Sequence, residues 1–195
     1  MDTPMVIVLV VAVLAVIAVI GVAAWLYLKK RRSAELRKSF GPEYDRAREE
    51  HPDQRSAERS LEERKQRVEQ LQIRALSPDE RDQFAERWRS AQAQFVDDPG
   101  GATRVADALV GEVMQARGYP VGDFEQRAAD VSVDHPRVVE HYRAADAIAA
   151  IALRTDRGQA DTGDTEDLRQ AIVHYRALFD DLLEVEAPAP GEAPR

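Results

Sequence analysis

The sequence predicts an all-α protein with one N-terminal transmembrane helix, a helical stalk and a small antiparallel helical bundle. Residues 5–28 form an uncharged run of 24 residues, and beyond it apolar residues recur at helical spacing. No window alternates apolar and polar residues for long, so no sheet is expected. The predicted divisions are a short extracytoplasmic N-terminus (1–4), the membrane span (5–28), a basic juxtamembrane segment and stalk (29–76), the bundle (77–183) and a disordered tail (184–195).

The uncharged run at residues 5–28 is predicted to be an uncleaved membrane anchor. A helix of this length spans roughly 36 Å, which exceeds the ~30 Å of a bilayer's hydrocarbon core. Cleavage as a signal peptide, which would make the protein secreted, is the alternative, but Asp2 stands where such a peptide needs basic residues. Positive charge on the C-terminal side alone predicts a plasma-membrane protein with its N-terminus outside and its domain in the cytoplasm. The predicted membrane-interface residues are Trp25, Tyr27, Lys29, Lys30, Arg31 and Arg32.

The segment after the anchor is basic and then helical. Residues 29–38 hold six basic side chains, which either attract an anionic leaflet or serve only as the orientation signal. Gly41-Pro42 is predicted to end the first helix, and residues 43–50 to form a short one. A longer helix from Pro52 to about residue 74 is expected to be either a weak coiled coil or a solvated helix lying against the domain. Its thin apolar series is Ala57, Leu61, Val68 and Leu71.

The clearest helix start in the chain lies at Ser77, which opens the predicted bundle. Ser77 can cap the helix, Pro78 suits its first position, and Glu80 completes a capping box. Four helix faces are then predicted from apolar residues at helical spacing. In chain order they are Phe84, Trp88, Ala91 and Phe95; Val105, Leu109, Val113 and Ala116; Val138, Tyr142, Ala145, Ala149 and Ala152; and Leu168, Ile172, Tyr175, Phe179 and Leu182. Helices of this length with short loops favour an antiparallel bundle.

Boundaries between these helices are predicted from their turn residues. Asp98-Pro99 is expected to start the second helix of the bundle and Gly118 to close it. A short helix is expected at about 123–130, and the next is expected to open at residues 134–136. A polar loop should follow before the last helix, which is predicted at about 165–183.

Composition excludes several kinds of chemistry. There is no cysteine, so disulfides, thiolate metal sites and cysteine nucleophiles are absent. Residues 77–183 hold 12 basic and 21 acidic side chains, a net charge of −9, so the domain is unsuited to bind nucleic acid. None of the four histidines follows a glutamate by three residues, and no phosphate-binding or hydrolase motif is present. We expect no cofactor, and the residues lean against an enzyme without excluding one.

The densest polar segment of the predicted bundle follows its second helix. Its candidate site residues are Asp123, Arg127, Asp130, Asp134 and His135. One interpretation makes Asp130, Asp134 and His135 an acid/base or cation site. The other is structural, with Asp123 and Asp134 capping helices and Arg127 pairing with carboxylates three or four residues away.

Several short motifs are shared with a known group of proteins. They are FGPEYD at 40–45, FVDDP at 95–99, RGYP at 117–120, DFEQRAAD at 123–130, SVDHP at 132–136, DLRQ at 167–170 and HYR at 174–176. With these motifs the chain resembles, over about residues 36–183, a family of uncharacterised bacterial, mostly actinobacterial, proteins that are small, helical and membrane-anchored or secreted. That family carries no established activity. The resemblance implies that residues 123–136 are a signature of the domain.

These observations favour a single-pass membrane protein that presents a small acidic helical domain at the cytoplasmic face as a protein-interaction or scaffolding module. Its expected partners are the lipid bilayer and another protein, and the oligomeric state is left open. One alternative is an enzyme or cation-binding bundle that uses Asp130, Asp134 and His135. The other is an anionic-lipid surface sensor that uses residues 29–38.

Overall fold

The computed structural model describes the backbone of residues 3–155 and 162–184, and within these ranges it contains eight helices and no strand. The helices are α1 (Thr3–Phe40), α2 (Pro42–Glu50), α3 (Gln54–Glu69), α4 (Pro78–Gln94), α5 (Pro99–Arg117), α6 (Phe124–Asp134), α7 (Val139–Thr155) and α8 (Thr162–Glu184). The predicted all-α class is therefore confirmed. Side chains are described at residues 14, 16–152 and 165–184, so the predicted tail at 185–195 lies outside the described residues.

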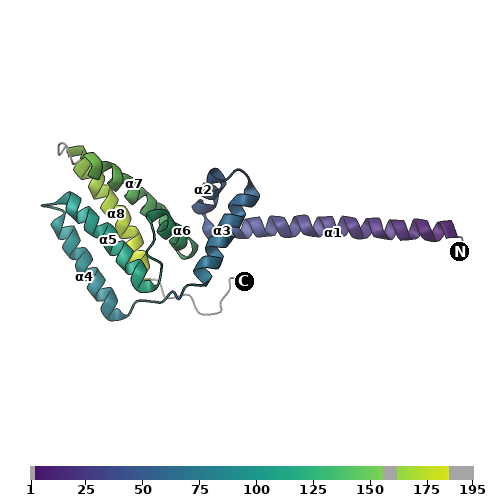
Figure 1. Ribbon diagram of the computed structural model, residues 1–195, viewed down its shortest axis with the longest axis horizontal. Coiled ribbons are helices and arrows are strands. Elements are labelled where there is room, and N and C mark those ends of the chain that lie inside the picture. The colour runs from purple at the N-terminus through teal and green to yellow at the C-terminus, as the bar shows by residue number, and fades with distance from the viewer. Residues whose placement is uncertain (1–2, 156–161, 185–195) are drawn as a thin grey trace.

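Helix α1 is one unbroken helix that projects as a rod from the body formed by the other seven helices (Figure 1). The described side chains from Leu14 to Arg32 are exposed, whereas Leu36 and Phe40 are buried in the body. Among the residues that the structure describes, none of the helices has the length and apolar character that a membrane crossing requires. The predicted span at residues 5–28, whose side chains up to residue 13 lie outside the described part, thus stays a prediction.

Helices α2 and α3 fold back beside the end of α1. Gly41 has a φ of 51°, which reverses the chain after Phe40, and Pro42 then opens α2. Asp53 caps α3 by accepting a hydrogen bond from the Ser56 backbone N–H at 3.0 Å. Together these helices bury a small core, which consists of Leu36, Phe40, Tyr44, Ala47, Ala57 and Leu61. Helix α3 also contacts α6, so it lies against the domain, as one of its two interpretations anticipated.

The larger core lies among α4, α5, α7 and α8. Helix α8 packs between α5 and α7, and α4 covers the other side of α5 (Figure 1). The rings of Trp88 on α4 and Phe179 on α8 stack with their centroids 4.5 Å apart. All five residues predicted for the inner face of α8 are buried. On α5 the prediction was partly wrong, because Val105 is exposed and the buried face is turned toward Ala102, Ala106 and Val110 instead.

The bundle contains both antiparallel and parallel helix pairs. Buried Arg117, at the end of α5, donates a hydrogen bond from Nη1 to the Leu182 carbonyl, near the end of α8, at 2.7 Å. These two helices therefore run parallel, as helices two apart in chain order do in an antiparallel bundle. The chain reverses once between α5 and α7 and again between α7 and α8, so α8 must point the same way as α5. The pairs α4/α5 and α7/α8 are antiparallel as predicted.

Most of the predicted helix ends are confirmed. The capping box forms at Ser77, whose Oγ accepts from the Glu80 N–H at 3.2 Å while Glu80 Oε2 accepts from the Ser77 N–H at 2.8 Å. Asp98 and Asp123 cap α5 and α6. Gly118 ends α5 in the left-handed conformation, with a φ of 104°. The expectation of α3 reaching residue 74 was wrong, since it ends at Glu69.

Asp134 was wrongly predicted to cap the helix that follows it. It is the last residue of α6, and α7 begins only at Val139. The reason lies in the next two residues, because Pro136 disfavours helical conformation at His135, which has a φ of −123° and a ψ of 51°. The chain therefore leaves α6 at Asp134 and starts a new helix past the proline.

Candidate functional site

The carboxylates of Asp130 and Asp134 have different hydrogen-bond partners. Buried Asp130 accepts a hydrogen bond from Gln126 Nε2 at 2.8 Å, and its Oδ1 lies 3.7 Å from Arg67 Nη1 of α3. Asp134 accepts a hydrogen bond from the Tyr119 hydroxyl at 2.6 Å. Burial and the Asp134 carboxylate raise the pKa of Tyr119, so this phenol stays a donor. Asp130 thus connects α6 to α3, and Asp134 connects α6 to the loop that follows α5.

His135 has a different carboxylate partner. It is buried, and its Nδ1 bonds to Asp181 Oδ2 of α8, while its Nε2 is buried with no hydrogen-bond partner. Asp123 lies at the N-terminus of α6 and accepts from the Gln126 N–H at 2.8 Å. Within the described residues, no group of three or more His, Cys, Asp or Glu side chains could hold a metal ion. Three of the five candidates nevertheless lie around Tyr119, which bonds to Asp134 and whose ring centroid is 6.4 Å from that of His135. The charge of Asp130 also raises the pKa of Tyr119. Asp123 and Arg127 have other partners.

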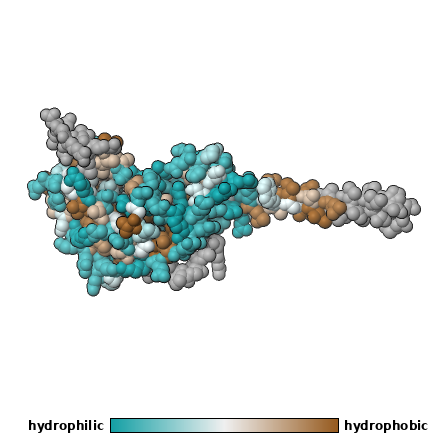
Figure 2. All heavy atoms as spheres, viewed as in Figure 1, coloured by the Kyte–Doolittle hydropathy of each residue, from teal (hydrophilic) through white to brown (hydrophobic). Residues whose placement is uncertain are grey.

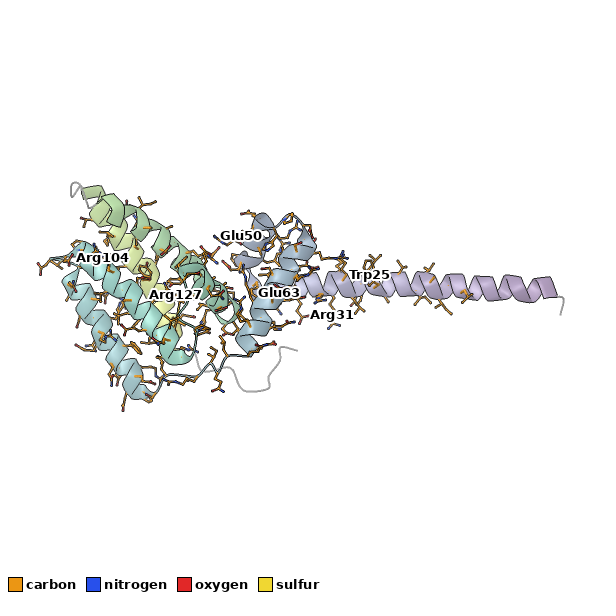
Figure 3. All side chains as sticks on the ribbon, in the orientation of Figure 1. Trp25, Arg31, Glu50, Glu63, Arg104 and Arg127 are labelled. Atoms are coloured by element: carbon orange, nitrogen blue, oxygen red, sulfur yellow. The ribbon has the colours of Figure 1, made fainter. Side chains whose placement is uncertain are left out.

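Arg127, labelled in Figure 3, contacts the neighbouring helices α5 and α7. Its Nε donates to the Tyr142 hydroxyl on α7 at 3.0 Å. Its Nη1 lies 4.0 Å from where a Cβ would stand on Gly111 of α5, so the missing side chain leaves room for the guanidinium. The predicted pairing of Arg127 along its own helix was wrong, because Asp123 and Asp130 have other partners and Arg127 turns toward the core.

Arg127 is the centre of a polar group within the bundle, which we call the Arg127 cluster. Its members, contributed by four helices, are Asp107, Arg127, Tyr142, Asp146 and Tyr175. Burial raises the pKa of both aspartates, and Asp107 raises that of Asp146 further, while the guanidinium opposes both shifts. Burial also raises the pKa of Tyr142 to about 12. Because Tyr142 and Tyr175 are fully buried, the cluster is suited to fixing helix positions rather than to meeting a substrate.

The sequence could not reveal the Arg127 cluster. Helical spacing correctly assigned Tyr142 and Tyr175 to apolar faces, but it does not indicate that their hydroxyls need polar partners. Asp107 and Asp146 each stand beside a buried alanine, which is the one local signal that they border the core.

A second buried charge group joins the N-terminal helices to the bundle. Glu43 of α2, 1% exposed, lies between Arg64 of α3 at 3.2 Å and Arg143 of α7 at 3.0 Å. Arg143 also reaches exposed Glu125 of α6 at 2.7 Å. We call Arg64, Glu43 and Arg143 the Glu43 triad. It ties α2 and α3 to α7, so the helices that follow the rod are fixed to the bundle.

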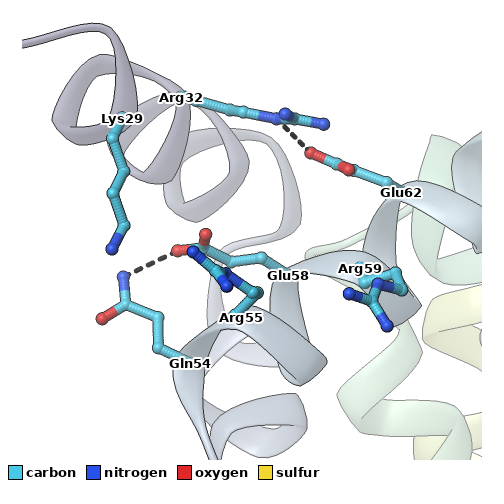
Figure 4. A pocket seen from close by; sticks show the side chains of 7 residues that line it. All are labelled: Lys29, Arg32, Gln54, Arg55, Glu58, Arg59 and Glu62. Carbon is cyan, nitrogen blue, oxygen red and sulfur yellow. Dashed lines mark hydrogen bonds and ion pairs between the residues drawn. The ribbon is translucent and has the colours of Figure 1, made fainter. Parts of the chain in front are cut away.

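A groove of about 330 Å³ runs between the exposed part of α1 and the start of α3 (Figure 4). Its lining residues are Lys29, Arg32, Gln54, Arg55, Glu58, Arg59 and Glu62. Arg32 pairs with Glu62, and Gln54 Nε2 donates to Glu58 Oε1 at 2.7 Å. Burial would raise the pKa of Glu58, but hydrogen bonds from neighbouring polar groups and the charge of Lys29 lower it. The groove thus holds four basic and two acidic side chains.

The six predicted membrane-interface residues are all exposed on α1, and Lys29 and Arg32 among them line this groove. Lys29 Nζ lies 5.7 Å from the centre of the Trp25 ring. Figure 3 shows Trp25 and Arg31 on the rod where it enters the body. Aromatic and basic side chains therefore form one band around the helix, as a lipid headgroup layer favours.

No family model, curated protein or solved structure matches this chain. The family resemblance suggested by the sequence motifs therefore stays a prediction.

Proposed function

We propose that this chain is a single-pass membrane protein that holds an acidic helical domain at the cytoplasmic face, where the domain binds another protein. One observation carries the proposal. Helix α1 continues without a break from exposed apolar side chains into the buried core of the body. An exposed apolar surface of this size marks contact with lipid or with a partner.

The distribution of apolar side chains around α1 favours lipid. From Val16 to Leu28 the large apolar side chains are 53–68% exposed, and apolar residues dominate the visible face of this part of the rod (Figure 2). No charged residue occurs at positions 16–28, so the helix has no charged face there. A helix that lies on a membrane surface needs a charged face, whereas a helix that is apolar all round is suited to spanning. The basic band that follows supports an orientation with the domain in the cytoplasm.

The position of the first buried residues supports a domain held close to the bilayer. Leu36 follows Leu28 by eight positions, which corresponds to about 12 Å along the helix. The Glu43 triad then fixes the N-terminal helices to the bundle. The domain carries a net charge of −9 over residues 77–183, which favours a protein partner with a basic surface.

Membrane insertion is tested by placing arginines in the apolar segment. Each arginine at the centre of a spanning helix costs about 2.5–3.5 kcal/mol. The double variant Ile17→Arg/Ile20→Arg should therefore release the chain from membranes washed at alkaline pH. The matched control is Val121→Arg/Val173→Arg, which adds two arginines at exposed apolar positions of the body and should stay with the membrane. Equal retention of both variants would contradict the anchor.

Orientation and partner binding need separate experiments. A reporter that is active only in the cytoplasm, fused after Arg195, should be active; an inactive one would refute the orientation. A proximity-labelling enzyme at the same end should mark proteins that a fusion of residues 1–40 alone does not mark. If the two labelled sets of proteins are identical, the proposal that the domain binds another protein is wrong.

The groove beside the predicted headgroup layer supports a second candidate function, recognition of anionic lipid. Helix α3 brings Arg55 and Arg59 to the same groove as Lys29, so it doubles the number of cations that residues 29–38 place there. Each basic side chain near an anionic surface contributes about 1 kcal/mol. Native mass spectrometry of the full chain in detergent should show phosphatidylglycerol retained over phosphatidylcholine. This preference should fall in Arg55→Gln/Arg59→Gln and persist in the control Arg81→Gln; a preference unchanged in the first variant would exclude the groove.

A further inference from the structure

Two histidines from neighbouring helices meet ring to ring on the surface of the bundle. His141 of α7 and His174 of α8 place their Nδ1 atoms 2.9 Å apart, with ring centroids 5.2 Å apart. His141 is exposed and His174 half-buried, so solvent reaches the pair. We propose that His141 and His174 form a binding site for a divalent transition-metal ion of the class of Ni²⁺, Cu²⁺ or Zn²⁺.

The separation of the two nitrogens agrees with metal–ligand geometry. An ion held about 2.0–2.1 Å from each imidazole nitrogen places two ligands at a right angle about 2.9 Å apart. Tetrahedral ligands at the same bond length are about 3.4 Å apart. The spacing of 2.9 Å therefore fits neighbouring positions of a square-planar or octahedral ion. The ring centroids, 5.2 Å apart, show that the two Nδ1 atoms point straight at each other, so both rings must turn to direct their lone pairs at one ion. A tetrahedral ion would require the rings to separate by about 0.5 Å, so the site favours Cu²⁺ and Ni²⁺ over Zn²⁺.

The chemistry of the pair is also suited to a metal. With both rings neutral, one Nδ1 carries a proton and donates it to the lone pair of the other. Metal binding needs both lone pairs, so the protonated ring moves its proton from Nδ1 to Nε2, and no proton is lost overall. Water completes the coordination shell. The net charge of −9 over residues 77–183 raises the local concentration of cations.

The other two histidines differ from this pair. His135 Nδ1 is bonded to Asp181, and His51 Nδ1 lies 2.9 Å from the Ala47 carbonyl oxygen. Each therefore has one ring nitrogen engaged with an oxygen of the protein rather than with a second imidazole. Metal bound at His141 and His174 would cross-link α7 to α8 and stabilise the folded state, because the unfolded chain does not hold the two rings together. This inference does not depend on the membrane anchor.

The test uses the full chain without a histidine tag in detergent, titrated with NiCl₂, CuCl₂ or ZnCl₂ while thermal unfolding is followed by circular dichroism. At a free metal concentration one hundred times the dissociation constant, the unfolding midpoint should rise by roughly 5–10 °C. His141→Gln and His174→Gln should each abolish the rise, and His51→Gln should keep it. Bound Cu²⁺ should show the electron paramagnetic resonance signature of two imidazole nitrogens.

Three results would overturn the proposal. The first is no rise in the unfolding midpoint with Ni²⁺ or Cu²⁺. The second is a rise in His141→Gln or His174→Gln as large as that of the unsubstituted chain. The third is a Cu²⁺ signal from fewer than two imidazoles. Because these glutamine variants alter side chains at the protein surface, their unfolding without metal serves as the check that they fold.

Discussion

Replacing Glu43 by alanine should destabilise the folded chain by about 3–5 kcal/mol. The substitution leaves Arg64 and Arg143, whose side chains are only 12% and 11% exposed, facing each other without the carboxylate between them. Removing one partner of a buried charge group costs about this much, because the remaining charges stay desolvated. At about 2–4 °C per kcal/mol for a chain of this size, the unfolding midpoint should fall by roughly 6–20 °C.

The matched control is a second carboxylate that pairs with Arg143. Glu125 also pairs with Arg143, but its side chain is 68% exposed, so Glu125→Ala should cost no more than about 1 kcal/mol. Urea unfolding of the full chain in detergent, followed by circular dichroism, compares the two variants directly. Equal free energies of unfolding in Glu43→Ala and Glu125→Ala would refute the view that burial gives the triad its importance. Replacing all three triad residues by apolar ones of similar volume should cost far less than Glu43→Ala alone.

Three further substitutions test other parts of the fold. Burial raises the pKa of Asp107 in the folded state above its unfolded value near 3.8. The stability that the protonated carboxyl contributes is therefore fully present below about pH 3.8 and is lost as the pH rises through the folded pKa. Asp107→Asn should therefore reduce the loss of stability between about pH 4 and pH 7, measured by urea unfolding; an unchanged pH slope would argue against it. Gly118→Ala should cost about 1–3 kcal/mol in the same assay, because the φ of 104° is strained for alanine and its Cβ would lie 2.5 Å from the Gln72 carbonyl oxygen; a neutral effect would contradict this. Ser77→Ala removes the cap of α4 and should lower the unfolding midpoint by roughly 2–4 °C, or not at all if the capping box is unimportant.

Features determined by neighbouring residues were predictable from the sequence. The capping box at Ser77, the left-handed turn at Gly118 and the cap at Asp123 each depend on only a few residues, and all three were correct. The inner face of α8 was also correct, because a regular apolar stripe fixes which side of a helix is buried. Asp134 was the instructive error, since its residue type suits a cap but Pro136, two positions later, moved the helix boundary.

Features that depend on distant contacts were not predictable. The partner of Arg127 could not be predicted from helical spacing, because Tyr142 lies on another helix. His135 pairs with Asp181, 46 residues away, rather than with the acidic residues beside it. The parallel course of α5 and α8 likewise follows from how the helices stack, which the apolar stripes alone leave open.

Because α1 is continuous, it determines both the rotation of the domain about the helix axis and its distance along that axis. Residues 14–28 and the buried Leu36 belong to one helix, so they share one helical phase. Inserting a single residue between them would raise the body by about 1.5 Å and turn it by about 100° around the rod. Inserting seven would return it to within about 20° of its original bearing, about 10 Å farther out. In the proposed membrane-anchored state, the number of residues in α1 therefore determines which surface of the bundle faces a partner at the membrane.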